Sequence, residues 1–506
     1  MLKYAFILFA CCFLSPLAAQ ITPPNCYDCK WVLGYDSNEL DVPGGGAIFD
    51  FNIQPTQISF FNKKIHIDFT SACTSDRYGN LQMYSNGCAV YGKDNIKLEN
   101  GGGLNPGVWY NGYCTGDENI NGYIARQGMI ILPFPDRPDQ YCIIHKTIDS
   151  ITLPDYGLGE HCRRLNSTVV DMSLNNGKGK VTQKNTIITQ DTISYGQLMA
   201  CRHANGRDWW LLSAKILSDK FYRYLLSPEG VALVGIQTVD SLMTREDDIG
   251  QAVYSPDGTK YIRNRYDGVD IYDFDRCSGI ISNHRFIRLG TQISSSGSSV
   301  SPNSRFLYVS TGSKLYQFDL EAANIESSKT LIATPDNPES NFYQQLLGAD
   351  GKIYIIPAAT IELMHTIESP NLKGDSCNLQ QNNISLPCYN AFSLPNMPNF
   401  RLGRLVGSSC DTLATAIAEV EQLGELRVQP NPATDLLHIA YHTENTTALT
   451  VAISDYTGKK IQTLSLDPAS GSLDINTSAL PNGLYLCTLY DSATHRQQSV
   501  KFVVMR

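Results

Sequence analysis

The densest group of chemically capable side chains combines an imidazole, an amide, a guanidinium and a carboxylate with two indoles: His203, Asn205, Arg207, Asp208, Trp209 and Trp210. Such a group can bind a sugar, because an acid and a base hydrogen-bond the hydroxyls while an aromatic face packs on the ring. It can also serve the fold alone, with the polar groups bonding backbone turns and the indoles packing between sheets. These six residues are our candidate ligand-binding site, and the structural role is the favoured interpretation of them.

The other polar residues do not form the motifs of covalent or metal-assisted catalysis. A nucleophilic hydrolase needs Ser or Cys with a His base and an acid, yet no Gly-x-Ser-x-Gly elbow occurs among these residues. A zinc enzyme needs paired histidines, whereas His161 follows Glu160 without a second one. We therefore predict no catalytic residue, no metal site and no cofactor, which makes an enzyme the less favoured class.

Residues 1–19 are predicted to be a signal peptide. Lys3 precedes an apolar run at 4–14, and Ser15 to Ala19 has the small residues of a cleavage site. The run is shorter than the roughly 20 residues that a membrane-spanning helix needs, and no other segment could span. A lipoprotein box at residues 8–11 is disfavoured because Phe9 is bulky. We therefore expect an exported chain.

Thirteen of the 15 cysteines follow that cleavage site, in a compartment where disulfides persist. Short spacing predicts three local disulfides, which are Cys26 with Cys29, Cys73 with Cys88, and Cys377 with Cys388. The odd total leaves at least one free thiol. The CxxC spacing of the first pair also suits zinc or redox chemistry, but no second CxxC follows, so a structural disulfide is expected.

The composition favours short strands joined by tight turns. Only 18% of the 506 residues are charged, and the chain has 39 Gly, 24 Pro and 27 Tyr. The net charge is −9 and no Lys/Arg cluster occurs, which excludes nucleic acid as a partner because phosphate binding needs clustered positive charge.

A turn followed by a strand recurs at 255–262, 301–308 and 348–354, at intervals of about 46 residues. In these phrases Pro presets φ, Asp or Asn bonds its own backbone, and Gly accepts a positive φ, so the chain reverses in four residues. The interval is close to the roughly 40–50-residue period of a propeller blade. Weaker copies occur at 76–84 and 227–230.

One four-stranded blade cannot bury both of its faces, so such units close into a ring. Residues 20–408 accommodate seven WD-repeat-like blades, or eight as the alternative, at about 46–55 residues each. After a linker at 409–424 the pattern changes, and residues 425–506 alternate short strands with Pro, Gly and Asn turns. The predicted fold class is all-β, with a β-propeller followed by a small Ig-like β-sandwich.

The last 80 or so residues resemble a known family through motif blocks that occur in order: Pro430-Asn431-Pro432, Asp455 with Gly458-Lys459, Leu480 with Gly483 and Tyr485, and Lys501 to Arg506. They are similar to the type A C-terminal sorting domain of the Bacteroidota type IX secretion system. The resemblance implies that the type IX machinery is a partner. It further implies that the protein is secreted or held at the outer cell surface, with no integral membrane segment after signal cleavage.

The body resembles large secreted propeller-like proteins of the same bacteria, which lack an assigned activity, at 79–87, 203–210, 272–279 and 394–401. These phrases carry architecture and no chemistry. We expect a non-catalytic binding or scaffold protein whose loops grip a surface protein or a glycan. The alternative is a secreted propeller enzyme acting on glycans, lactones or peptides, whose acids would line the central channel.

Overall fold

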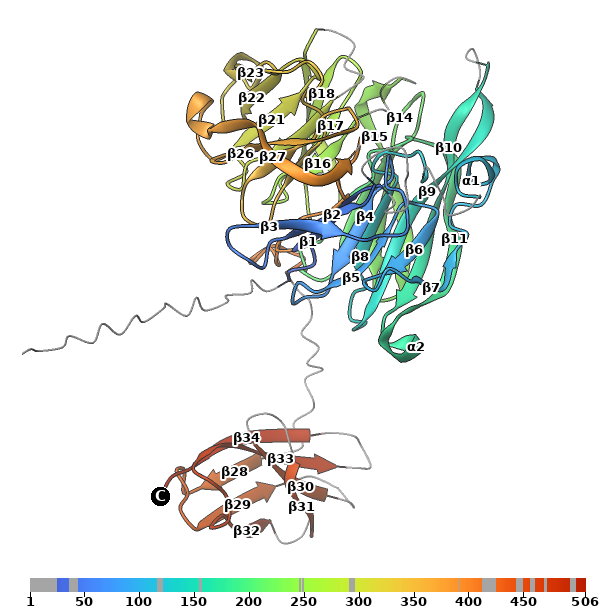
Figure 1. The fold of residues 1–506 in the computed structure, drawn as a ribbon. Coiled ribbons are helices and arrows are strands. Elements are labelled where there is room, and N and C mark those ends of the chain that lie inside the picture. The colour runs from blue at the N-terminus through green and yellow to red at the C-terminus, as the bar shows by residue number, and fades with distance from the viewer. Residues whose placement is uncertain are drawn as a thin grey trace, which may run out of the picture. The chain divides into compact units, whose positions relative to one another are not determined.

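The computed structural model describes residues 25–35, 44–115, 122–153, 157–244, 247, 250–290, 296–390, 392–411, 425–442, 449–455, 460–467, 471–491 and 497–506. The chain forms two compact units, Met1–Asp411 and Thr412–Arg506 (Figure 1). The predicted signal peptide and residues 412–424 of the predicted linker lie outside the described residues.

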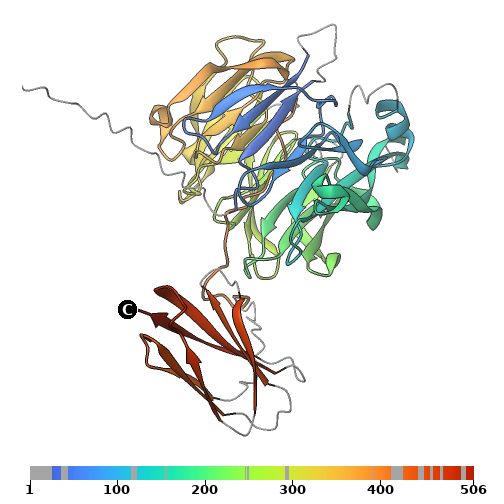
Figure 2. The same ribbon diagram turned by 60° about the horizontal axis from the view of Figure 1, so that its bottom comes forward.

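The first unit is a β-propeller of seven blades, as predicted, which follow one another around the unit (Figure 2). Blade 1 consists of β1 (Lys30–Gly34), β2 (Gly46–Asp50) and β3 (Gln57–Phe61); blade 2 of β4 (Ala72–Ser75), β5 (Leu81–Ser85), β6 (Ala89–Gly92) and β7 (Lys97–Gly102); blade 3 of β8 (Met129–Pro133), β9 (Gln140–Leu153), β10 (Gly157–Asp171) and β11 (Lys180–Ile193); blade 4 of β12 (Met199–Arg202), β13 (Trp209–Ala214), β14 (Ser218–Ser227) and β15 (Gly230–Met243); blade 5 of β16 (Ala252–Tyr254), β17 (Lys260–Asn264), β18 (Gly268–Phe274) and β19 (Ile281–Arg288); blade 6 of β20 (Gly297–Val300), β21 (Phe306–Ser310), β22 (Leu315–Asp319) and β23 (Thr330–Ala333); and blade 7 of β24 (Gln345–Leu347), β25 (Ile353–Ile355), β26 (Ile361–Ile367) and β27 (Leu379–Asn390). Short helices α1 (Val108–Tyr113), α2 (Leu174–Gly177), η2 (Glu326–Ser328) and η3 (Gly374–Cys377) lie in connections.

Consecutive strands pair antiparallel within each blade, and β7 and β11 also share a parallel bridge that joins blades 2 and 3 into one eight-stranded sheet. The inner strands of neighbouring blades contact one another, as β16 contacts β12 and β20. Blade 7 returns to blade 1, where Tyr354 meets Trp31 edge to face at 5.3 Å. The ring is therefore closed and each blade buries its faces on its neighbours.

The repeated turn phrases lie between the first and second strands of blades 5, 6 and 7. Each turn closes with a backbone hydrogen bond, for example from Gly258 N to Ser255 O at 2.8 Å, and Gly258 has a φ of 73°. The predicted interval is therefore one blade. The weaker copy at 227–230 is out of phase, because it lies between the third and fourth strands of blade 4. Any hairpin turn favours the same residues, so the turn alone does not fix the position in a blade. We call the side of the ring that carries these turns the turn face.

Two of the predicted disulfides are wrong. Cys73 is a buried free thiol, and Cys88 pairs instead with Cys114. Cys73 packs in the main core cluster, whereas Cys88 packs in a separate cluster with Cys114.

Cys377 and Cys388 are also buried free thiols. Cys377 ends η3, two residues before β27, and Cys388 lies near the end of β27. The nine residues of strand between Leu379 and Cys388, at about 3.3 Å each, hold the two thiols roughly 30 Å apart. The predicted pair Cys26–Cys29 is present.

The second unit is the predicted β-sandwich. One sheet has the order β28 (Glu425–Gln429), β29 (Leu436–His442) and β32 (Ser472–Asn476). The other has the order β31 (Lys460–Leu466), β30 (Leu449–Asp455), β33 (Gly483–Asp491) and β34 (Gln497–Val504). Alternate residues of both sheets, among them Leu437, Val451, Cys487 and Phe502, form the core between them.

Candidate functional site

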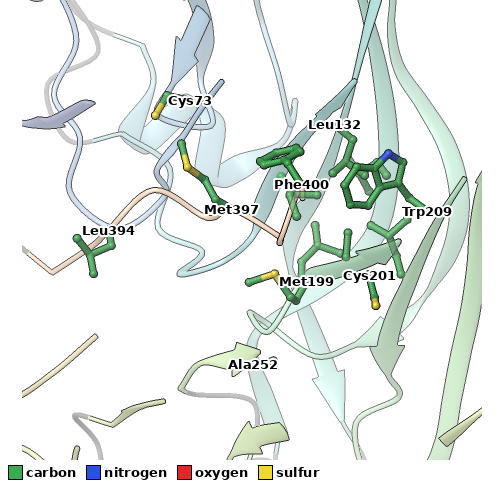
Figure 3. Packing of buried hydrophobic residues seen from close by; sticks show 14 of the residues in the cluster. Cys73, Leu132, Met199, Cys201, Trp209, Ala252, Leu394, Met397 and Phe400 are labelled. Atoms are coloured by element: carbon green, nitrogen blue, oxygen red, sulfur yellow. The ribbon is translucent and has the colours of Figure 1, made fainter. Parts of the chain in front are cut away.

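The central channel of the ring is occupied by the chain itself. After blade 7, residues 392–411 run through the channel, and we call this segment the strap. Its Leu394, Met397 and Phe400 side chains are buried among strands of different blades, and Phe400 lies close to Trp209 (Figure 3). The strap contains 394–401, one of the distinctive phrases of the sequence.

Asn396 ties the strap to three blades at once. Its backbone N–H donates to Ser71 O at 3.0 Å, at the entrance to blade 2. Its side-chain Nδ2 donates to Met129 O at 2.9 Å and to Leu198 O at 2.6 Å, which belong to blades 3 and 4. Gln127 donates to the Asn396 Oδ1 at 3.3 Å. One buried amide therefore satisfies inner-strand carbonyls that face the channel.

Among the described residues blade 1 has no first strand, and the strap runs in that place. Tyr27 O, just before β1, accepts a hydrogen bond from the backbone N–H of Ser75, the last residue of β4, beside the first turn of blade 2. β1 therefore begins at the turn face, whereas the first strand β4 ends at that face. Arg401 donates to both carboxylate oxygens of Asp28 at 2.6 and 2.7 Å, just before β1. The end of the body thus closes the ring onto its first blade.

The strap leaves the channel at the turn face and is fixed there. Leu405 N donates to Ala204 O at 2.8 Å. Cys410 forms a disulfide with Cys277, 133 residues away in sequence, in the turn between β18 and β19. The disulfide lies immediately before the boundary between the two units, at Asp411.

A cavity of about 90 Å³ remains beside the strap. Its lining includes Asp28 and Arg401, which are paired with each other, and Tyr254, whose hydroxyl is buried without a hydrogen-bond partner among the described residues. A volume of this size holds a few water molecules rather than a sugar or peptide.

The predicted ligand-binding residues lie in and after the first turn of blade 4, at the turn face. Asp208 is buried and accepts hydrogen bonds from Asn205 at 2.8 Å and from Arg207 at 2.7 Å. The Asp208 carboxylate raises the pKa of the Arg207 guanidinium. Arg207 also pairs with Asp136 of the neighbouring turn at 2.7 Å. The structure therefore brings these polar groups together.

His203 bonds within the fold on both ring nitrogens. Its Nδ1 accepts from Asn205 N at 3.0 Å, and its Nε2 lies 3.1 Å from Cys277 O. Burial lowers the pKa of His203, which favours the neutral ring. The strap crosses this turn at Gly206, where a Cβ would lie 2.7 Å from Arg404 N.

The two indoles are buried in β13 rather than presented to solvent. Trp209 packs under Arg202, whose Cζ lies 3.6 Å from the ring centroid, and burial lowers the pKa of Arg202 to about 10. Trp210 donates from Nε1 to Arg276 O at 2.8 Å. These contacts supply the structural role that we weighed against binding, and ligand binding by this turn stays a prediction.

In the second unit, the terminal Arg506 brings separated sorting-domain motifs to one corner. Its guanidinium donates to Thr434 O at 3.2 Å, to Leu480 O at 3.1 Å and to Thr477 O, and its N–H donates to Asn482 Oδ1 at 3.0 Å. The last residue therefore links the turn after β28 with the turn before β33. We call this region the Arg506 corner.

The other motif residues support the same corner. Asn431, between Pro430 and Pro432, accepts from Val503 N at 2.9 Å and donates to Lys501 O at 3.2 Å. Tyr485, two residues after Gly483, stacks on Phe502 and donates to Pro481 O at 2.7 Å. Asp455 ends β30, while Gly458 and Lys459 lie outside the described residues.

Sequence reasoning missed the residues that fix the strap, namely Asp28, Arg401, Cys277 and Cys410. Asp28 and Arg401 lie 373 residues apart, and Cys277 and Cys410 lie 133 residues apart. Neither pair therefore shows a local spacing signal in the sequence. A cysteine left without a near neighbour was the single available clue to the Cys277–Cys410 bond.

Comparison with known proteins identifies the second unit. Residues 427–505 match the family described as the secretion system C-terminal sorting domain. This domain marks proteins that are secreted by the type IX system of Bacteroidota and located at the cell surface. No curated protein sequence matches the chain.

Several solved structures are similar to the chain at low sequence identity. A putative 6-phosphogluconolactonase from Bacteroides uniformis is 11% identical, with a TM-score of 0.44, 72% of this chain covered and 98% of that one. PorZ, a surface component of the type IX secretion system of Porphyromonas gingivalis, is 13% identical, with a TM-score of 0.34 and coverages of 92% and 63%. AztD from Citrobacter koseri is 15% identical, with a TM-score of 0.36 and coverages of 71% and 96%.

Across the described ranges, no helix has the length and apolar character needed to cross a membrane. Those same residues contain no group of three or more His, Cys, Asp or Glu side chains placed to hold a metal ion.

Proposed function

From the premise of an exported chain with a sorting domain at residues 427–505, we propose a non-catalytic binding or scaffold protein of the cell surface. The observation that supports this function is the strap. An enzyme of this architecture would gather its acid and base in the central channel, but here the strap runs through the channel, and the cavity beside it has a volume of about 90 Å³. Recognition is therefore assigned to the two faces of the ring, where a rigid scaffold holds the loops.

The sorting role is tested by removing residues 425–506 in the source bacterium and comparing periplasmic, surface and medium fractions. The truncated chain is expected to stay in the periplasm, because the type IX machinery no longer finds its signal. Normal export of the truncated chain would contradict the assignment.

The binding role is tested with the mature full-length chain on a glycan array and against extracted surface proteins. Saturable binding without chemical change of the bound molecule is expected. Turnover of a glycan, a lactone or a peptide would instead establish the secreted propeller enzyme.

A further inference from the structure

A second cluster of charged and aromatic side chains lies at the end of the channel opposite the turn face. Asp68 and Phe69 precede β4, Arg126 precedes β8, Tyr343 precedes β24, and Phe392 begins the strap. Because first strands run from this end toward the turn face, the residues before them meet here although they are up to 324 positions apart. We call this group the Arg126 cluster.

Three aromatic rings surround the guanidinium of Arg126. Its Cζ lies 5.0 Å from the ring centroid of Phe69, 5.3 Å from that of Tyr343 and 5.8 Å from that of Phe392. Phe69 and Phe392 stack on each other at 5.2 Å with an interplanar angle of 13°. Cation–π contacts hold the guanidinium in place without using its N–H donors.

Those donors have no hydrogen-bond or ion-pair partner among the residues that the structure describes. Two further polar atoms of the cluster are buried and lack a partner there, the hydroxyl of Tyr343 and Oδ1 of Asp68. Tyr343 is only 1% exposed. A half-buried guanidinium normally reaches a carboxylate or a carbonyl, as Arg401 does with Asp28.

Burial raises the pKa of Asp68 to about 6, and nearby Arg126 opposes this shift. Burial also raises the pKa of Tyr343 to about 12, so its hydroxyl keeps its proton and can donate. The cluster therefore offers several donors around one fixed positive charge.

We infer that the Arg126 cluster is a binding site for the oxyanion of a small ligand, either a carboxylate or a phosphate. The planar fork of a guanidinium matches two oxygens of such a group, and the Tyr343 hydroxyl adds a neighbouring donor. The site is separate from the predicted residues 203–210 at the turn face, and it does not depend on the proposed binding function. The Arg126 cluster would bind the anion in the same way if the protein were an enzyme.

The test uses the mature full-length chain at pH 5.5, where Asp68 is largely neutral. Saturation-transfer NMR measures binding of acetate and of acetamide, a neutral molecule of the same shape, and inorganic phosphate is added as a competitor. Acetate is expected to bind saturably and acetamide at least about tenfold more weakly, because only the anion forms charge-assisted bonds. If phosphate displaces acetate at a concentration below that of acetate, the cluster is a phosphate site. If phosphate does not displace acetate, the cluster is a carboxylate site.

Variants locate the site. Arg126→Met is expected to weaken acetate binding at least about tenfold, and Arg126→Lys, which keeps the charge without the fork, several-fold. Tyr343→Phe removes only the hydroxyl and should cost about threefold. Arg137→Met is the matched control, because Arg137 also stacks on a ring, at 4.2 Å from the Phe134 centroid, but donates to Pro228 O.

Tryptophan fluorescence of each variant reports whether the ring remains folded. If Arg126→Met is destabilised, acetate binding by the Arg126→Lys and Tyr343→Phe variants decides the result. Absence of saturable acetate or phosphate binding, equal binding of acetamide, or unchanged binding in the folded Arg126 and Tyr343 variants would each overturn the assignment.

Discussion

At the scale of single residues, two arginines show how a guanidinium can serve the backbone. Arg506 bonds three carbonyl groups of the sorting unit, and Arg276 bonds Arg202 O at 2.9 Å and His203 O at 3.2 Å under the strap. A guanidinium with five donors can satisfy several carbonyls that would otherwise be buried unpaired. An arginine in the sequence therefore does not distinguish a binding site from a structural joint, and Arg126 stands out through its contacts alone.

Arg506→Met is expected to loosen the Arg506 corner and reduce export. Three carbonyls lose their donor, which costs about 1–3 kcal/mol in the free energy of unfolding of the second unit. Hydrogen-exchange mass spectrometry should show weaker protection of residues 477–483 and 501–505, and the periplasmic fraction should rise.

The control is Lys460→Met, which removes the same charge from an exposed side chain of β31, outside the motif blocks. Equal loss of protection in both variants would show that charge, and not the bonds to the carbonyls, matters at this corner.

At the scale of elements, the strap replaces a strand. Blades 2 to 7 each contribute their own first strand, but the described part of blade 1 has three strands, and the ring is completed by residues that follow blade 7. The strap has no regular pairing, so its hold depends on individual side chains, above all Asn396. The repeat period could not reveal this, because period counting finds blades that are complete in sequence.

Asn396→Ala is expected to lower the free energy of unfolding of the first unit by about 2–4 kcal/mol, because buried carbonyls of blades 3 and 4 lose their donor. Asn399→Ala, which removes a bond to Pro256 O and a local bond from Arg401 N in the same segment, should cost only about 1 kcal/mol. All four Trp residues lie in the first unit, so the tryptophan fluorescence of the full chain in urea reports this unit alone. Similar costs for the two variants would argue against Asn396 as the main anchor.

At the scale of the whole molecule, burial of neutral histidines predicts sensitivity to acid. Burial lowers the pKa of His66 and of His145 to about 3, and that of His365 to about 4. The unfolded chain takes up these protons near pH 6.5, whereas the folded ring does not. Stability is therefore full above pH 6.5 and is lost as the pH falls toward the folded pKa values.

Each of the three histidines is expected to cost about 1.4 kcal/mol per pH unit below pH 6. Asp68 acts in the opposite sense, since its pKa is raised to about 6 and its protonation relieves a buried charge between pH 6 and 4. Urea midpoints at pH 7, 6 and 5 should fall, and His365→Gln should flatten the slope below pH 6 by about half, because Asp68 offsets about one of the three histidines there. A midpoint that does not change between pH 7 and 5 would contradict the burial of these rings.

The all-β class, the blade interval, the sandwich and the sorting motifs could be predicted from the sequence, because turn chemistry, strand patterning and short motif blocks are local in the chain. It also placed the Cys26–Cys29 disulfide, whose partners are three residues apart. The closure of the ring by residues 392–411, the disulfides Cys88–Cys114 and Cys277–Cys410, and the contact of Arg126 with three aromatic rings could be seen only in the folded structure. Folding brings these segments together in space, around blade 2 for Cys88 and Cys114 and around the whole ring for the others, and residue types at separated positions carry no measure of that proximity.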